Sequence, residues 1–361
     1  MKICVYAICK NESCFAQRWY RSMAEADGIF VLDTGSEDGT AELLRELGAQ
    51  VTVEEIIPWR FDVARNRSLE LVPEDCDICV CTDLDEVFEP GWRTLLEQAW
   101  TAGTTQAAYR YTWNFNSDGT EGYVFWIEKA HARQGYRWIH PVHEVLQYTD
   151  SRVPARKIYV EGMQLNHHAD PNKSRAQYLP LLEQAVWEDP EDDRNMHYLG
   201  REYLFRGQWD RCIRTLQYHL NMPKATWADE RAASMRFIAR AYIQKGDRGA
   251  ARAWYWRAIA EAPHLREPYL ELAKMLYEEK NWDGVLYLTG CALAIEHRPR
   301  SYICESEAWG GLLWDLRSLG LFYTGRMEEA LNAVRRALEF TPKDERLKKN
   351  AELIGRAVSA D

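Results

Sequence analysis

A pattern of short side chains recurs four times in the second half of the chain and restricts it to closely packed helix pairs. A turn position repeats at intervals of 39, 34 and 45 residues, at Gly207, Gly246, Lys280 and Gly325. Compact residues follow it by five positions at Cys212, Ala251, Val285 and Ala330. Twelve positions before these compact residues stand small residues, at Gly200, Ala239, Ala273 and Ser318. Seven positions after the last three compact residues stand alanines, at Ala258, Ala292 and Ala337. Glycine ends a helix readily and small residues let two helices approach, so the pattern predicts antiparallel helix pairs.

This pattern resembles the tetratricopeptide repeat (TPR) family, and Pro263 and Pro342 close two of the units. The unequal intervals leave a plain helical bundle with chance spacing as the alternative. The resemblance implies a solenoid over residues 173–361, whose surface suits an extended partner or a second copy of the chain.

Residues 1–172 follow a different pattern, in which short apolar runs alternate with helical periods. Strands are predicted at 2–8, 28–33, 50–55 and 77–85, and helices at 15–26, 38–47 and 61–72. Such alternation predicts parallel βαβ units. Segments 107–113 and 122–133 read as antiparallel strands, and 137–148 as a further strand or loop. The first domain is therefore predicted to be α/β, with a Rossmann-like mixed sheet.

The bulk composition limits the classes of function. A net charge of −10 argues against a broad nucleic-acid surface, and no apolar run is long enough to span a membrane. Nine cysteines, an odd number in a large chain, favour reduced thiols and a cytoplasmic location. Cys76 and Cys79 have zinc-ligand spacing but lack a second pair.

Three carboxylates crowd the end of the strand predicted at 77–85. They are Asp83, Asp85 and Glu86 in the stretch "TDLDE". Side chains alternate along a strand, so Asp83 and Asp85 share one side and can hold a hard divalent cation such as Mg²⁺ or Mn²⁺. A solvated strand end is the alternative.

An acid also ends the strand at 28–33, before the loop "DTGSEDGT". Ligands of parallel sheets bind at the carboxyl ends of strands, so Asp33 is a candidate for hydrogen bonds to a nucleotide. An ordinary βα loop explains the same residues.

Taken in order, "KNE", "DTGSEDGT", "FDVARN" and "TDLDE" resemble family 2 glycosyltransferases of the GT-A fold over residues 1–170. That resemblance implies a nucleotide-sugar donor, an Asp-x-Asp metal site and inversion at the anomeric carbon. By this resemblance, Glu12 and Asp33 would contact the nucleoside, and Arg65 and Asn66 would support the donor site. Asp83 and Asp85 would bind the metal, with Asp83 also near the ribose. Asp62 departs from the family pattern and is a secondary candidate for the base or a helix cap.

The same resemblance implies a later metal ligand in "LNHHADPNKSR". His167 is the first choice and His168 the second, against a surface histidine pair. An imidazole ligand suits Mn²⁺ better than Mg²⁺. Lys173 and Arg175 are candidates for the diphosphate, against solvated cations at a helix start.

Inverting transfer needs a base for the acceptor's proton. By resemblance, Glu144 is the predicted base in "WIHPVHEVL", and His143 orients the acceptor or shares the role. The rivals in the preceding loop are Asp118 and Glu121. Trp126 and Trp138 are candidates for a sugar-binding floor or for the core.

These assignments predict a metal-dependent glycosyltransferase that moves a hexose from a UDP-sugar to a peptide, protein or glycan. Bacterial peptide and protein glycosyltransferases are similar in combining the two modules. The alternative is a TPR-type binding protein with an inactive GT-A domain. A nucleotidyltransferase is disfavoured because "CKNES" lacks a glycine-rich basic loop.

Overall fold

The computed structural model describes residues 1–116, 119–170 and 175–359. The chain divides into two compact units, Met1–Glu188 and Asp189–Asp361. Each unit is described by itself. Asp118 and Lys173 lie outside the described residues.

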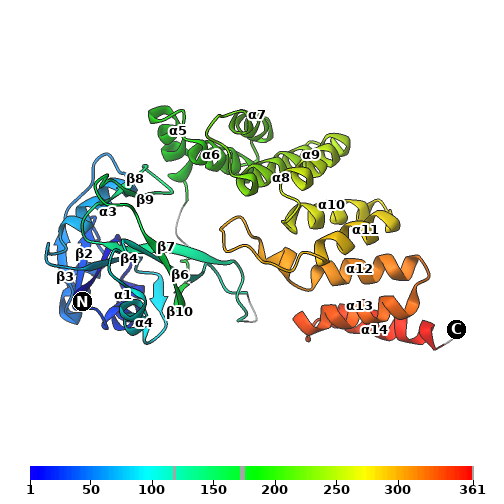
Figure 1. Ribbon diagram of the computed structural model, residues 1–361, viewed down its shortest axis with the longest axis horizontal. Coiled ribbons are helices and arrows are strands. Elements are labelled where there is room, and N and C mark those ends of the chain that lie inside the picture. Colours follow the sequence, from blue (N-terminus) through cyan, green and yellow to red (C-terminus); the bar gives the residue numbers. More distant parts are fainter. Residues whose placement is uncertain (117–118, 171–174, 360–361) are drawn as a thin grey trace. The chain divides into compact units, whose positions relative to one another are not determined.

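The first unit is built on one mixed sheet (Figure 1). Its eight strands lie in the order β3 (Gln50–Val53), β2 (Gly28–Asp33), β1 (Ile3–Cys9), β4 (Ile78–Asp83), β7 (Val124–Ala132), β6 (Gln106–Thr112), β10 (Lys157–His167) and β5 (Glu86–Phe88). A separate hairpin pairs β8 (Tyr136–Ile139) with β9 (Val145–Tyr148). The helices of this unit are α1 (Ser13–Met23), α2 (Thr40–Leu47), α3 (Phe61–Glu70), α4 (Trp92–Ala99) and α5 (Tyr178–Glu188).

The periodicity predicted the parallel strands β1 to β4 and the antiparallel strands β6 and β7, and the structure has both. It did not predict β5, α4 or β10. Strand β10 is parallel to β6 and antiparallel to β5, with His167 opposite Glu86. This pairing brings the end of the first unit's last strand beside the acidic tip that follows β4.

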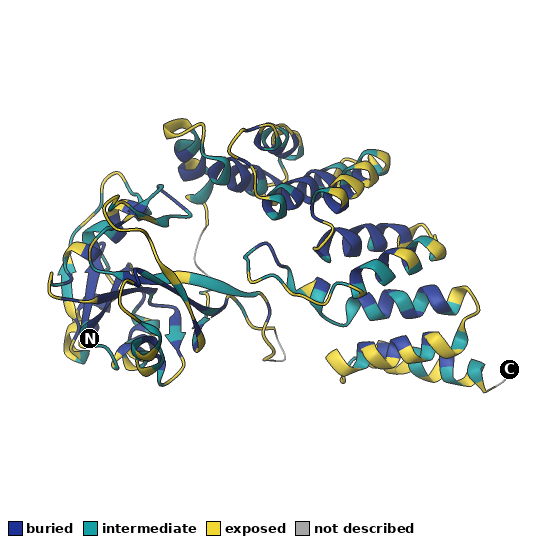
Figure 2. Ribbon diagram, in the orientation of Figure 1, coloured by how far each residue is buried: buried dark blue, intermediate teal, exposed yellow. Residues whose placement is uncertain are grey.

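Both faces of the sheet are covered, which explains the uniformly apolar β1. Alternate residues of β1, including Val5, pack with Trp19 and Trp92 on one face. Cys4 and Tyr6 pack with Leu69 and Trp138 on the opposite face. Figure 2 shows the central strands as buried. Strand ends are therefore the places where polar side chains can meet.

The second unit consists of helices (Figure 1). They are α6 (Asp193–Phe205), α7 (Trp209–Leu220), α8 (Ala228–Gln244), α9 (Arg248–Glu261), α10 (Glu267–Glu278), α11 (Trp282–Leu293), a 3-10 turn η1 (Ser306–Trp309), α12 (Leu312–Tyr323), α13 (Met327–Phe340) and α14 (Glu345–Val358). Helices α6 to α13 form four pairs, and a turn of three residues joins the two helices of each pair.

The repeated positions have one structural meaning in each pair. The aligned turn residues take left-handed backbone conformations, with φ of 69°, 81°, 57° and 78° at Gly207, Gly246, Lys280 and Gly325. The aligned short side chains are fully buried at Cys212, Ala251, Val285 and Ala330. A Cβ added at Gly200 would overlap the Leu216 side chain, so α6 and α7 need glycine there to approach. The predicted helix pairs are confirmed by these elements.

Replacing Lys280 with glycine should raise the free energy of unfolding by about 1 kcal/mol, because the left-handed conformation strains a residue with a Cβ. Urea unfolding followed by helical circular dichroism measures this change. Lys245→Gly is the control. Lys245 follows the last residue of α8 and has an ordinary backbone φ of −84°, so glycine relieves no strain there. Because glycine increases the entropy of the unfolded chain, Lys245→Gly should lower the free energy of unfolding. Equal effects of the two substitutions would contradict the explanation.

The long interval before Gly325 reflects an inserted segment between α11 and α12. Residues 298–309, here called the strap, run back over α6, α8 and α10. Tyr302 stacks on Tyr198 of α6 with ring centroids 5.9 Å apart. Trp309 Nε1 donates to Glu267 Oε1 of α10 at 3.1 Å. The insertion therefore covers one face of the helix pairs.

The division between the units lies after Glu188, whereas the sequence placed it between residues 172 and 173, which are not described. Helix α5 belongs to the first unit because Tyr178 packs against Phe61 and His143, with ring centroids 6.2 and 5.7 Å apart. Over the described ranges, the chain offers no helix with the length and apolarity that crossing a bilayer demands.

Candidate functional site

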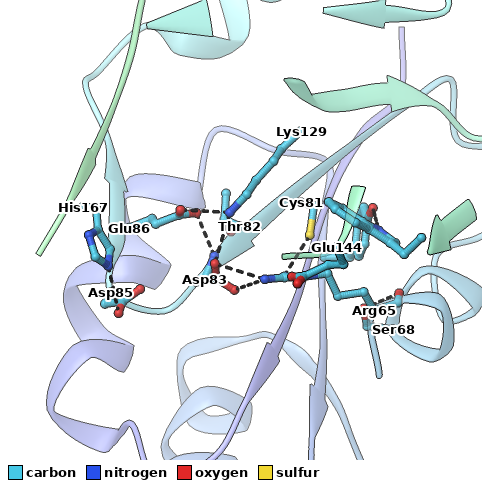
Figure 3. A network of polar contacts seen from close by, with 12 residues as sticks. Arg65, Ser68, Cys81, Thr82, Asp83, Asp85, Glu86, Lys129, Glu144 and His167 are labelled. Carbon is cyan, nitrogen blue, oxygen red and sulfur yellow. Dashed lines mark hydrogen bonds and ion pairs between the residues drawn. The ribbon is translucent and has the colours of Figure 1, made fainter. Parts of the chain in front are cut away.

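The acidic tip lies between β4 and β5, at the carboxyl end of the parallel strands (Figure 3). Side chains from several strands, from α3 and from two connecting segments meet there. The acidic cluster consists of the carboxylates of Asp83, Asp85, Glu86 and Glu144, together with Arg65, Lys129 and His167.

Two cations, buried Arg65 and partly buried Lys129, neutralise Asp83. Arg65 Nη2 lies 2.9 Å from Asp83 Oδ1, and Lys129 Nζ lies 3.1 Å from Oδ2. Both carboxylate oxygens therefore already face a cationic partner. A metal ion at Asp83, as the sequence predicts, would have to share or displace these contacts.

Glu86 is the most buried acid of the cluster and is satisfied within the protein. Its Oε1 accepts hydrogen bonds from Lys129 Nζ at 2.9 Å and Tyr111 OH at 2.7 Å, and its Oε2 accepts from the Asp83 backbone N–H. Burial opposes the charge of Lys129, but Asp83 and Glu86 outweigh it and raise its pKa. Sequence reasoning missed Lys129. Its signal is a lone lysine in the apolar stretch "FWIEKAHA" of a predicted strand.

Asp85 differs from the other acids because part of its carboxylate is buried without a partner. Its Oδ2 lies 3.3 Å from His167 Nε2, while Oδ1 has no hydrogen-bond partner in the described part of the chain. His167 Nδ1 lies 2.8 Å from the Trp113 carbonyl, which fixes the ring with Nε2 toward Asp85. The predicted pairing of Asp85 and His167 is thus present. His168 is turned away, with its ring stacked on Phe115 at 5.5 Å.

The charges of the acidic cluster do not balance. Four carboxylates face two permanent cations, which leaves two negative charges when His167 is neutral. Burial alone would lower the pKa of His167, but Asp85 and Glu86 outweigh it and raise that pKa. The unpaired Asp85 oxygen and this charge excess fit a divalent cation held by Asp85 and His167.

Arg65 links the predicted base to this cluster. Its Nε donates to Glu144 Oε1 at 2.5 Å, and its guanidinium lies 5.2 Å from the Trp138 ring centroid. Glu144 is therefore held by a guanidinium beside the acids. His140 and His143 flank the turn before it with φ of 78° and 51°, and strained non-glycine residues of this kind cluster at functional sites.

Several residues that the sequence assigned to the donor form hydrogen bonds or ion pairs with neighbouring residues of their own segment. Asp33 is fully buried, and its Oδ1 accepts from the backbone N–H groups of Gly35 and Ser36 at 2.9 and 2.7 Å. Asp62 forms a two-point ion pair with Arg60 at 3.0 and 2.9 Å.

Asn66 and Glu12 also contact the protein itself. The Asn66 side chain exchanges two hydrogen bonds of 2.8 Å with the Trp138 backbone and so fastens β8 to α3. Glu12 is buried, and its backbone N–H donates to Thr40 Oγ1 at 2.9 Å. The structure does not bring Glu12, Asp62 or Asn66 into the acidic cluster.

The remaining candidates lie around the cluster or outside it. Glu121 pairs with Arg110 on β6 at 2.5 Å. Trp138 is core, since it is buried and its Nε1 donates to Tyr6 OH at 2.8 Å. Trp126 packs against Tyr159 with centroids 5.4 Å apart. Arg175 lies over the Tyr178 ring at 4.8 Å.

No family model matches the chain. Among solved structures, a thermophilic TPR protein of Thermus thermophilus is 19% identical, over 49% of this chain and 88% of that one, with a TM-score of 0.34. Yeast Tom70 is 13% identical, over 52% and 37%, with a TM-score of 0.39. The C-terminal part of a TPR repeat-containing protein of Cytophaga hutchinsonii is 12% identical, over 52% and 67%, with a TM-score of 0.41.

These comparisons correct the family assignment made from the sequence. The structures reported as similar are TPR proteins, and no glycosyltransferase is among those reported. The predictions of membership in glycosyltransferase family 2 and of the GT-A fold class were therefore wrong. The stretch "TDLDE" is no longer assigned as that family's metal-binding motif. What the structure has is a mixed-sheet unit and a unit of helix pairs.

Proposed function

We propose that the second unit binds an acidic, aromatic segment of a protein partner on the face formed by α6, α8 and α10. This basic face is defined by the cationic side chains of Arg194, Arg236, Arg240 and Lys274. The strap occupies it in the structure and supplies the chemistry from which the partner is inferred.

The strongest contacts of the basic face are ionic. Arg236 Nη2 lies 2.6 Å from Glu305 Oε1 of the strap, and Arg240 Nη2 lies 2.8 Å from Glu305 Oε2. Both arginines also pair with Glu271 of α10. Two arginines of α8 thus share the Glu271 carboxylate of α10, and the strap adds the Glu305 carboxylate to the same pair of arginines.

Aromatic contacts lie on both sides of this ionic centre. Tyr302 OH donates to Glu230 Oε2 at 2.5 Å, and Arg194 lies 6.0 Å from the Tyr302 ring centroid. Lys274 Nζ pairs with Glu307 at 3.0 Å. The face therefore takes a segment with carboxylates spaced near an aromatic ring. Helix-pair repeats commonly hold extended partners on such a face.

The observation that carries this proposal is the pairing of Glu305 with both Arg236 and Arg240. To test it, we compare the affinity of a labelled peptide with the strap sequence, residues 298–309, for two forms of the full chain. One is the unmodified chain, and the other carries Glu305→Gln and Tyr302→Ala, which weaken the contacts of the strap. We expect this variant to bind the peptide at least tenfold more tightly than the unmodified chain does, because the competing segment is weakened.

Arg240→Glu in the loosened variant should abolish peptide binding in fluorescence anisotropy. Arg214→Glu, an exposed residue of α7 away from the strap, is the matched control and should leave binding unchanged. Peptide binding that tolerates Arg240→Glu would rule out the basic face as the recognition surface.

A second candidate function is favoured by the unpaired Asp85 oxygen. We infer that the acidic cluster holds Mn²⁺ or Mg²⁺ through Asp85 and His167 and that the first unit transfers a hexose from a nucleotide sugar to an acceptor. The cation would neutralise a diphosphate leaving group. Arg65 holds the Glu144 carboxylate beside the cluster, and Glu144 remains the candidate base with His143 next to it.

Asp85→Ala should weaken Mn²⁺ binding by tenfold or more, since loss of one of two protein ligands removes most of the site. Calorimetry with Mn²⁺, alone and with a UDP-sugar, measures this. Asp75→Ala is the control because Asp75 is exposed and pairs with Lys2 far from the cluster. Unchanged Mn²⁺ affinity in Asp85→Ala would exclude the cation site.

A further inference from the structure

Three buried side chains of the second unit could hold a metal ion that neither proposed function uses. His197 of α6, His219 of α7 and Glu230 of α8 each offer a ligand atom, and these atoms all lie within 4.8 Å of one another. Both histidine side chains are fully buried and Glu230 is nearly so. One helix pair and the first helix of the next pair therefore converge on this cluster.

Each histidine ring has one nitrogen that makes no hydrogen bond in the described part of the chain, although His219 Nε2 lies within ion-pair distance of Glu230. Ser234 Oγ lies 2.7 Å from His197 Nδ1 and 3.0 Å from His219 Nδ1. The Nε2 atoms of both rings are buried and have no hydrogen-bond partner among the residues described. Buried imidazole nitrogens without partners are costly, so a ligand that accepts their lone pairs would stabilise them.

Ser234 can set the ring tautomers that a metal requires. A hydroxyl oxygen has two lone pairs and can accept an N–H from both Nδ1 atoms. Each Nε2 would then carry a lone pair, which is the form that coordinates metals. The Ser234 hydroxyl therefore accepts the two Nδ1–H groups and fixes both tautomers. In other metal sites a backbone carbonyl often accepts this N–H from the histidine ligand.

The spacing of His219 and Glu230 also fits a metal site. His219 Nε2 lies 3.4 Å from Glu230 Oε1 without forming a hydrogen bond. Bonds of about 2.0–2.1 Å at tetrahedral angles separate neighbouring ligand atoms by about 3.4 Å. Glu230 Oε2 accepts from Tyr302 OH, so Oε1 is the oxygen left for a metal.

We propose that His197, His219 and Glu230 form a structural Zn²⁺ site that joins α6, α7 and α8. Two imidazoles and one carboxylate are a donor set that zinc takes in proteins, with a water molecule as the fourth ligand that completes the tetrahedron. The site is closed to solvent, so the ion would enter during folding and remain as a clamp between the first two helix pairs.

Zinc content of the full chain tests the proposal. The protein is made in the Asp85→Ala background, which removes the other cation site, and is dialysed against a weak chelator. Mass spectrometry of the metal should find roughly one zinc per chain. Glu230→Gln and His219→Asn should each lose it. His264→Asn is the control, because His264 is exposed and its Nε2 pairs with Asp229, which is not one of the three proposed ligands.

Co²⁺ gives a second readout that does not depend on stability. The Asp85→Ala chain refolded with Co²⁺ should show the visible bands of a tetrahedral site, and Glu230→Gln should not. Tyr302→Phe keeps all three ligands and should retain the bands. Zinc that survives Glu230→Gln in folded protein, or a parent chain without zinc and without Co²⁺ bands, would overturn the proposal.

Discussion

Replacing Arg65 with methionine should lower the free energy of unfolding of the first unit by about 3 to 5 kcal/mol. Arg65 is buried and pairs with Asp83 and Glu144 at 2.9 and 2.5 Å. Methionine fills much of the same volume but leaves both carboxylates beside each other with only Lys129 to oppose them. Thermal unfolding of the full chain, with hydrogen exchange of the sheet strands to identify the transition, measures the loss.

Arg67→Met is the matched control on the same helix. Arg67 is well exposed and its pairs with Glu54 and Glu70 face solvent, so its loss should cost less than about 1 kcal/mol. Similar losses for the two substitutions would show that Arg65 does not hold the acidic cluster together.

Glu271→Gln should destabilise the second unit by about 3 kcal/mol at neutral pH and by progressively less in acid. Burial alone would raise the pKa of Glu271, but Arg236 and Arg240 outweigh it and lower this pKa to about 2. Because the folded pKa lies below the ordinary value of 4.5, ionised Glu271 stabilises the fold above about pH 4.5. That contribution is lost as the pH falls toward 2.

Urea unfolding at several pH values, followed by helical circular dichroism, tests this dependence. The difference between the unmodified chain and Glu271→Gln should shrink steadily between about pH 4.5 and pH 2. Glu278→Gln is the control, since Glu278 is exposed on the same helix and pairs with Arg248. A difference that stays constant over this range would contradict the buried ionic role of Glu271.

The helix pairs were predictable because their constraints are local. A left-handed turn residue and short side chains at fixed offsets specify close packing without reference to distant residues. Lys280 shows how strong the pattern is, since it keeps the left-handed turn without glycine. The strap was not predictable, because its contacts depend on pairs such as Tyr302 with Glu230, which are 72 residues apart.

The acidic cluster was predictable only in part, for the same reason. Asp85 and His167 were expected together and lie 3.3 Å apart. Lys129 was missed, because only the pairing of β4 with β7 brings it to Asp83. The mistaken family assignment depended on four short motifs, two of which contain Asp33 and Asn66. Each of these side chains bonds to its own surroundings, a role that local sequence cannot distinguish from binding a donor.

The most direct test of the basic face is hydrogen exchange of the unmodified chain with and without the strap peptide. In the free chain the Glu305 backbone N–H donates to Glu267 Oε1 at 3.0 Å and should be protected. Saturating peptide should displace the strap, so exchange within residues 298–309 of the chain should accelerate while α6, α8 and α10 stay protected. Unchanged exchange in the strap at saturating peptide would contradict the proposal that this face recognises acidic, aromatic segments.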